Sequence, residues 1–218
     1  MVDEILGKVR TLFEKELKIP LEKNLNDYRY CTVLEFHKET KVYILADFIA
    51  AYVYFNNTNW ILINPSSFNY LNENRKTCAI LHECMHLVST KVSKDSYEIG
   101  FTIKNSHLVA LNEGVNEIAA DYVYNRICIG QYAYSKGYYI NRKIAEYIVN
   151  EIYPNKEDFV KEYVTENSYE FYKKVYYHFK ANNLLELHSI ILKIKDKYNM
   201  SKQKDKCEDI IKQYLQKR

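Results

Sequence analysis

The segment AILHECMHLV at residues 79–88 has the strongest bearing on the fold. Its two histidines, His82 and His86, are four residues apart, so on a helix they lie on one face about one turn apart. Apolar residues on both sides of the pair supply the buried face that such a helix needs. The segment therefore predicts a helix over residues 73–89 with both imidazoles on the same face.

Two imidazoles at this spacing are suited to binding one Zn²⁺ ion, at ~2.0–2.1 Å from each nitrogen. Glu83 directly follows the first histidine, where its carboxylate reaches a metal-bound water without binding the metal. In metalloproteases with this arrangement, zinc lowers the pKa of the water and the glutamate accepts its proton. The motif predicts His82 and His86 as ligands of a single zinc ion and Glu83 as the general base.

Catalytic zinc usually has three protein ligands, so a third must come from elsewhere in the chain. The sequence LNEGVNEIAAD at residues 111–121 carries Glu113, Glu117 and Asp121 at intervals of four residues. An acidic stripe alone more often faces solvent, but here it offers the carboxylate that the first helix lacks. The carboxylates that do not bind zinc suit another role, which is to accept the second ring N–H of a zinc histidine.

HECMH followed by LNEG resembles the gluzincin group of zinc peptidases, in particular its aminopeptidase-N-like branch and small uncharacterised bacterial relatives. In these enzymes the glutamate of an (L/W)-x-E-G segment is the third ligand. The resemblance implies an α+β, zincin-like fold with zinc on His82, His86 and Glu113, and Glu83 as general base. The Gly-Ala-Met-Glu-Asn segment of the aminopeptidase branch is absent, so we expect an endopeptidase.

A second register for the third ligand is open. The sequence NEIAAD at residues 116–121 resembles the N-E-x-x-x-D segment of thermolysin-like and neprilysin-like enzymes. That resemblance implies Glu117 as the ligand and Asp121 as the residue that orients a zinc histidine. We favour Glu113, because LNEG places it in the first turn of its helix with a small residue beside the metal.

The remaining sequence predicts an α+β fold: a small N-terminal sheet, the active-site helix and a mainly helical C-terminal lobe. Residues 3–18 have the apolar spacing of an amphipathic helix. Short runs rich in β-branched and aromatic residues then predict strands. These runs are Tyr30–Phe36, Lys41–Ala46, Ala51–Phe55 and Trp60–Ile63, with a helix as the alternative over residues 47–51.

The strand Trp60–Ile63, just before the active-site helix, has the place of the zincin edge strand, which pairs with an extended peptide. Residues 90–110 are expected to be loop with some strand, and Asn112 to be the N-cap of the next helix. Helices are expected over residues 112–129, 141–152, 157–164, 168–180, 183–198 and 203–217. We interpret residues 1–218 as one catalytic domain, with a zincin-like lobe at 1–130 and a helical lobe at 131–218.

Composition excludes several other classes of protein. The chain has 218 residues and is 47% hydrophobic, which suits a folded domain rather than a disordered chain. Its net charge of +3 is small for a nucleic-acid-binding protein, so we expect no nucleic-acid partner. Its five cysteines form no CxxC pair and are expected to be reduced thiols. The acidic N-terminus and the lack of an apolar run of ~18 residues predict no membrane segment and a cytoplasmic location.

The sequence thus predicts a zinc metallopeptidase that acts on a peptide or protein substrate, with its oligomeric state open. The alternative is a catalytically inactive zincin-fold module that binds zinc and peptide without turnover. A donor for the tetrahedral oxyanion is also needed. The candidates, none of them assigned, are His107, Tyr122, Tyr134, Tyr138 and Tyr139.

Overall fold

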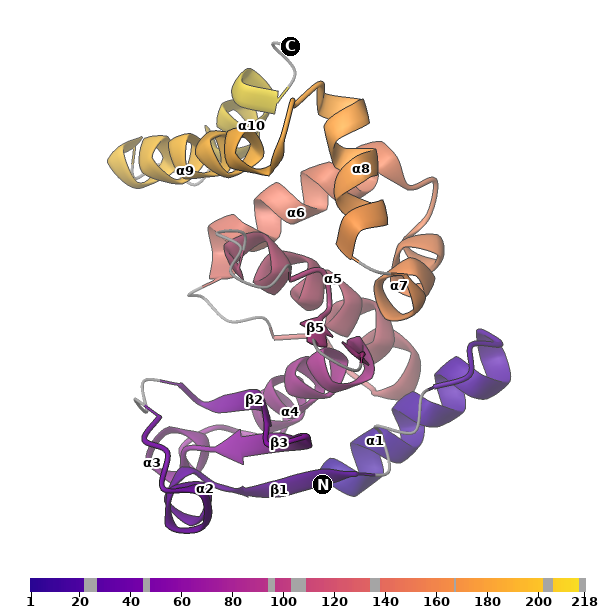
Figure 1. Cartoon of the computed structure of the whole chain (residues 1–218), viewed down its shortest axis with the longest axis vertical. Coiled ribbons are helices and arrows are strands. Elements are labelled where there is room, and N and C mark those ends of the chain that lie inside the picture. The colour runs from indigo at the N-terminus through magenta and orange to yellow at the C-terminus, as the bar shows by residue number, and fades with distance from the viewer. Residues whose placement is uncertain are drawn as a thin grey trace. The chain divides into compact units, whose positions relative to one another are not determined.

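The computed structural model is a mixed α+β protein with a small sheet and a mostly helical C-terminal part (Figure 1). It describes residues 1–21, 27–44, 48–93, 97–102, 109–133, 138–166, 168–201 and 206–215. Two compact units are present, one made of Met1–Thr90 and Ala120–Tyr134, the other of Lys91–Ala119 and Ser135–Arg218. The division into a single domain with lobes at 1–130 and 131–218 stays a prediction.

The first unit contains the small sheet and the helix that carries the histidine pair. Its elements are α1 (Val2–Thr11), the π-helix η1 (Leu12–Glu16), β1 (Tyr28–Thr32), α2 (Val33–Thr40), β2 (Ala50–Phe55), β3 (Thr58–Ile63), α3 (Pro65–Phe68) and α4 (Glu73–Val88). The strand order is β1-β3-β2, with β1 parallel and β2 antiparallel to β3 (Figure 1). The expectation that Trp60–Ile63 is an edge strand is therefore wrong. This segment belongs to β3, which is the central strand, whereas β2 lies at an edge.

A tight hairpin sets the register between β2 and β3. Asn56 and Asn57 join the strands with φ angles of 50° and 57°. Two consecutive positive φ angles are the signature of a type I′ turn, whose twist matches that of the flanking strands. The turn pairs Phe55 with Thr58, and the register continues to Ala50 opposite Ile63. The sheet edge formed by β2 is thereby fixed in position.

The run Tyr30–Phe36 is a strand only up to Thr32, so the prediction of a strand is wrong for its second half. The Thr32 hydroxyl accepts the N–H of Glu35, and the Glu35 carboxylate accepts the N–H of Thr32 at 2.7 Å. This reciprocal capping box satisfies two donors at the start of a helix. The chain therefore turns into α2 at Val33.

The apolar residues of α2 join the core from a helix instead of a strand. Phe36 is fully buried, and its ring meets that of Trp60 edge-on at 5.0 Å. The predicted strand Lys41–Ala46 is also wrong where it is described, because residues 41–44 form no strand. The helical alternative for residues 47–51 is wrong at Ala50 and Ala51, which belong to β2. Residues 45–47 lie outside the described part of the chain.

The helical C-terminal part agrees with the predicted helices. The elements after α4 are β4 (Thr90–Val92), β5 (Tyr97–Ile99), α5 (Val109–Ile127), α6 (Tyr139–Ile152), α7 (Lys156–Thr165), α8 (Ser168–Phe179), α9 (Leu184–Ser201) and α10 (Cys207–Leu215). β4 and β5 pair with each other, which confirms the expected strand content of residues 90–110. Each of α6 to α10 overlaps its predicted range, because strong apolar periodicity marks these helices.

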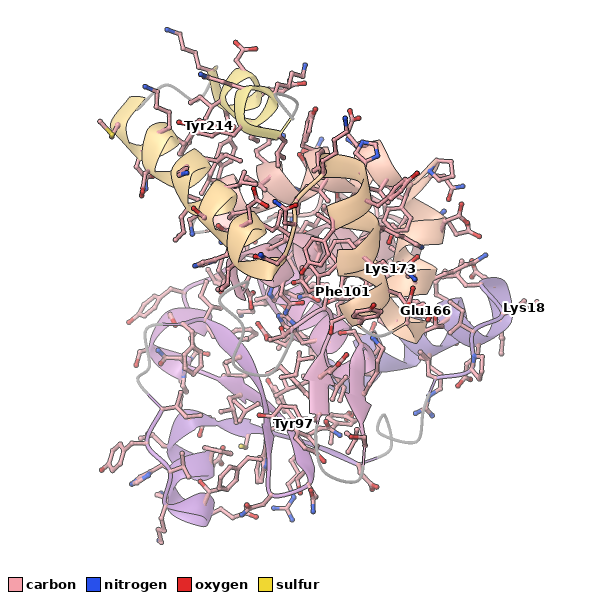
Figure 2. The ribbon with its side chains drawn as sticks, turned by 45° about the horizontal axis from the view of Figure 1, so that its top comes forward. Lys18, Tyr97, Phe101, Glu166, Lys173 and Tyr214 are labelled. Carbon is pink, nitrogen blue, oxygen red and sulfur yellow. The ribbon has the colours of Figure 1, made fainter. Side chains whose placement is uncertain are left out.

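Phe101, labelled in Figure 2, packs against three aromatic rings of the second unit. Its ring stacks on Phe171 of α8 at 4.1 Å and meets Tyr163 of α7 edge-on at 5.1 Å. Gly100, directly before it, has a φ of 57°, in the left-handed region that favours glycine. A side chain at Gly100 would also collide with the Tyr163 hydroxyl, 2.4 Å from the position of the missing Cβ. The chain can therefore pass close to α7 only with a glycine here.

In the part of the chain that the structure describes, no helix has the length and apolar character needed to cross a membrane. All five cysteines are described, and all of them are free thiols, as predicted.

Candidate metal centre

Helix α4 carries His82, Glu83 and His86 in its second half, and its N-terminus is capped by a side chain. The side chain of Asn72 caps the helix by accepting the N–H of Arg75 at 2.9 Å. All three side chains are buried, with 6%, 8% and 6% of the surfaces of these residues exposed. Polar side chains are rarely buried to this extent unless they are satisfied by partners. The burial therefore separates this trio from the solvated polar face of an ordinary surface helix.

The two histidines lie on the same face of α4, as their spacing predicts. Their ring centroids are 4.9 Å apart, and the ring planes are inclined by 79°. The hydroxyl groups of Ser89 and Thr90 both donate to the carbonyl oxygen of His86, at 3.1 and 2.7 Å. These bonds satisfy a carbonyl in the last turn, where no intrahelical partner is available. The turn that carries His86 is thereby held in place.

Glu83 is connected to the sheet through a residue that sequence reasoning did not find. Its carboxylate oxygen Oε2 accepts the backbone N–H of Tyr52, on β2, at 2.7 Å. The ring of Tyr52 also lies beside that of His86, with centroids 6.4 Å apart and planes inclined by 22°. A backbone donor leaves no mark in the residue type, so no sequence signal identifies Tyr52.

Among the described residues, one group of side chains could hold a metal ion, and it consists of His82, His86 and Glu113 of α5. The donor atoms of His82, His86 and Glu113 all lie within 4.8 Å of one another. Helix α5 is continuous, and its C-terminal half is bonded to α4 through the Tyr124 hydroxyl, which donates to Asn74. Glu113 is in the N-terminal half of the same helix, about three turns before Tyr124.

Glu117 and Asp121, the residues of the rival register, lie elsewhere on α5. Glu117 is buried, with 2% of its surface exposed, and Asp121 is half-buried. The Asp121 carboxylate accepts a hydrogen bond from the Asn125 side chain at 3.0 Å. Among the described residues, the group suited to holding a metal contains Glu113 and neither of these two. The geometry thus favours Glu113, although its role as a ligand stays a prediction.

The donor set fits a divalent cation with borderline-soft character. Two imidazole nitrogens and one carboxylate oxygen are the ligands of many catalytic zinc sites, which leave one position for water. With neutral imidazoles, the set carries one negative charge, so a bound divalent ion would keep a net positive charge. The nearby Cys84 is fully buried, and burial raises the pKa of its thiol well above the ordinary value. Among the described residues, the group of donor atoms suited to holding a metal does not include Cys84.

Two buried asparagines support the part of α5 that carries Glu113. Asn112 accepts the backbone N–H of Phe101 at 2.9 Å, and Asn116 accepts the hydroxyl of Tyr163 at 2.8 Å. The prediction that Asn112 is the N-cap is wrong, because α5 already begins at Val109. Its amide oxygen accepts the N–H of Phe101, which lies before the helix, and so does not cap α5.

Gly114 of α5 lies where this helix packs against α6. A Cβ at Gly114 would lie 2.3 Å from the carbonyl oxygen of Asn141 and 2.9 Å from the Cβ of Ala145, both on α6. The missing side chain therefore allows α5 and α6 to approach closely. The small residue of the LNEG segment, expected beside a metal, is explained here by this approach.

We expect Gly114→Ala to destabilise the protein. Overpacking against a backbone carbonyl costs about 1–3 kcal/mol, and the gain in helix propensity of about 1 kcal/mol offsets only part of it. Gly7→Ala on α1 is the matched control, because nothing lies within 4 Å of a Cβ there. Urea unfolding should give a lower midpoint for Gly114→Ala and an equal or higher one for Gly7→Ala. A Gly114→Ala midpoint at or above that of the parent would refute the packing role.

The candidate oxyanion donors are only partly described. Residues 103–108 and 134–137 lie outside the described chain, which leaves His107 and Tyr134 without a structural account. Tyr122 is buried, and the guanidinium of Arg126 lies over its ring at 3.6 Å from the centroid. Tyr139 packs against Tyr198, with ring centroids 6.0 Å apart. None of these contacts assigns a donor.

Comparison with known proteins adds no family to this picture. No protein-family model matches the chain, and neither the curated proteins nor the solved structures gave a significant match.

Proposed function

We propose that this protein is a zinc-dependent peptidase of the gluzincin type, with a zincin-like fold, that cleaves internal bonds of peptides or proteins. One observation carries the proposal, which is that the donor atoms of His82, His86 and Glu113 lie within 4.8 Å of one another. The proposal is supported by the position of Glu83, which adjoins His82 on the same helix and is buried with it. Neither nucleic acid nor membrane is part of the proposed function.

In the proposed mechanism, zinc, when bound, supplies Lewis-acid polarisation of the scissile carbonyl and lowers the pKa of the attacking water. His82, His86 and Glu113 would hold the ion. Glu83 accepts a proton from the attacking water as the new carbon–oxygen bond forms. It then donates this proton to the leaving nitrogen as the carbon–nitrogen bond breaks, which regenerates the carboxylate. The burial of Glu83 keeps bulk water from competing for that proton.

The test is a peptidase assay with a chelator control. Zinc-loaded protein should cleave an internally quenched peptide library or casein, lose this activity with a zinc chelator and regain it when zinc is added. Product masses should show cuts at internal bonds, as expected for an endopeptidase. Stoichiometric zinc without cleavage would instead support a module that binds zinc and peptide without turnover. Failure to bind any divalent metal would refute both functions.

A further inference from the structure

Tyr52 contacts two of the residues proposed to act in the site. Its backbone N–H donates to Oε2 of Glu83 at 2.7 Å, and its ring lies 6.4 Å from that of His86, nearly parallel to it. One strand residue thus bonds to the proposed base and has its ring beside that of a proposed zinc ligand. Both contacts come from outside the HECMH segment, because Tyr52 is on β2.

The register of the sheet explains why this N–H reaches α4. In an antiparallel pair, residues whose N–H and C=O groups face the partner strand alternate with residues whose groups face away. The Ile49 carbonyl accepts the N–H of Asn64 from the β3 side at 3.0 Å, so position 49 faces the partner. By the same alternation positions 51 and 53 face β3, and position 52 faces away from it. The Tyr52 N–H therefore points outward from the sheet edge, where Glu83 accepts it.

The side chain of Tyr52 is anchored across the sheet. Its hydroxyl donates to Oδ1 of Asn59 at 2.6 Å, and the Asn59 amide donates to the carbonyl oxygen of Asp27 at 3.3 Å. Asn59 is buried, with 3% of its surface exposed. The chain of bonds runs from the β2 edge through β3 to the residue before β1. It restrains the ring of Tyr52 and, with it, the backbone amide.

We propose that Tyr52 is a positioning residue for Glu83 and His86, an inference whose catalytic part rests on the proposed peptidase function. The Tyr52 N–H holds Oε2 of Glu83, which orients the other oxygen to accept the proton of the attacking water. The ring packs beside His86 and limits its rotation. A carboxylate held in this way loses little rotational freedom when it acts, and small misplacements of a catalytic group are costly.

A proline substitution tests the backbone donor directly. Both Tyr52→Pro and Tyr52→Ala remove the tyrosine ring. Only Tyr52→Pro also removes the backbone N–H, so the difference between the two variants measures the effect of this donor. Proline is tolerated on an edge strand where the N–H does not join the ladder. We expect kcat of Tyr52→Pro to be at least about tenfold below that of Tyr52→Ala, with KM and zinc content unchanged. Tyr54→Pro and Tyr54→Ala are the control pair. The N–H of Tyr54, like that of Tyr52, faces away from β3, and the two control variants should have equal kcat values.

Amide hydrogen exchange on the zinc-free chain tests the contact without any assay of activity. In Glu83→Ala, the Tyr52 amide should exchange at least about tenfold faster than in the parent, because its acceptor is gone. The amide of Val53, which faces β3, should keep its rate. If no variant hydrolyses peptides, the proposed function fails, and the exchange rates alone decide whether Tyr52 positions Glu83. An unchanged Tyr52 exchange rate in Glu83→Ala, or equal kcat values for Tyr52→Pro and Tyr52→Ala, would overturn the inference.

Discussion

Glu83→Gln is expected to lower kcat by about 10²–10⁴-fold, the usual contribution of general acid–base catalysis, while the protein still binds one zinc ion. Glutamine has nearly the same shape, and its amide oxygen can still accept the N–H that Tyr52 donates to Oε2 of Glu83. The fold and the ligand set should therefore persist. What is lost is the ability to accept a proton at neutral pH. Steady-state kinetics with metal analysis of the same preparation measures both quantities.

The matched control is Glu73→Gln on the same helix. Glu73 pairs with Lys76 at 2.9 Å, but 75% of its side chain is exposed, so losing its charge should leave kcat unchanged. The control separates loss of the base from loss of a negative charge on α4. A Glu83→Gln protein that binds zinc and keeps full peptidase activity would refute the role of Glu83 as general base.

Glu113→Ala is expected to weaken zinc binding by more than about 100-fold. Even a residue that only supports a ligand typically changes metal affinity by 10–100-fold, and Glu113 is proposed as a ligand. The change removes one of three donors that lie within 4.8 Å of one another. Titration against a competing chelator gives the affinity, and circular dichroism checks that the helices are intact.

The comparison variant is Glu117→Gln, which preserves volume at a position with 2% of its surface exposed. It should retain zinc, because Glu117 is not among the grouped donors of the described residues. If Glu117→Gln loses the metal and Glu113→Ala keeps it, the thermolysin-like register is correct and the assignment of Glu113 is wrong.

Local patterns allowed the helical elements to be predicted. The helices predicted over residues 73–89 and 141–152 closely match α4 (Glu73–Val88) and α6 (Tyr139–Ile152). Their apolar spacing identifies them, because residues three and four apart lie side by side on a helix. The same local reasoning grouped His82 with His86. The pattern of residues 112–129 also placed Glu113 on a second helix, and α5 (Val109–Ile127) carries it.

The parts that were missed depend on contacts distant in sequence or on competition between local signals. The residues Tyr30–Phe36 are β-branched and aromatic, but the capping box of Thr32 and Glu35 outweighs that preference and starts a helix. The central position of β3 depends on a parallel partner about thirty residues away, which no local pattern encodes. The bond from the Tyr52 N–H to Glu83 could not be predicted either, because a backbone amide donates regardless of residue type.

The most direct test of the account is anomalous scattering at the zinc edge from crystals of the zinc-loaded protein. The account predicts a single zinc peak bound by His82, His86 and Glu113, with Glu83 beside it and bound to the Tyr52 N–H. A peak whose third protein ligand is Glu117, a peak bound by other residues, or no peak at the two histidines would contradict it.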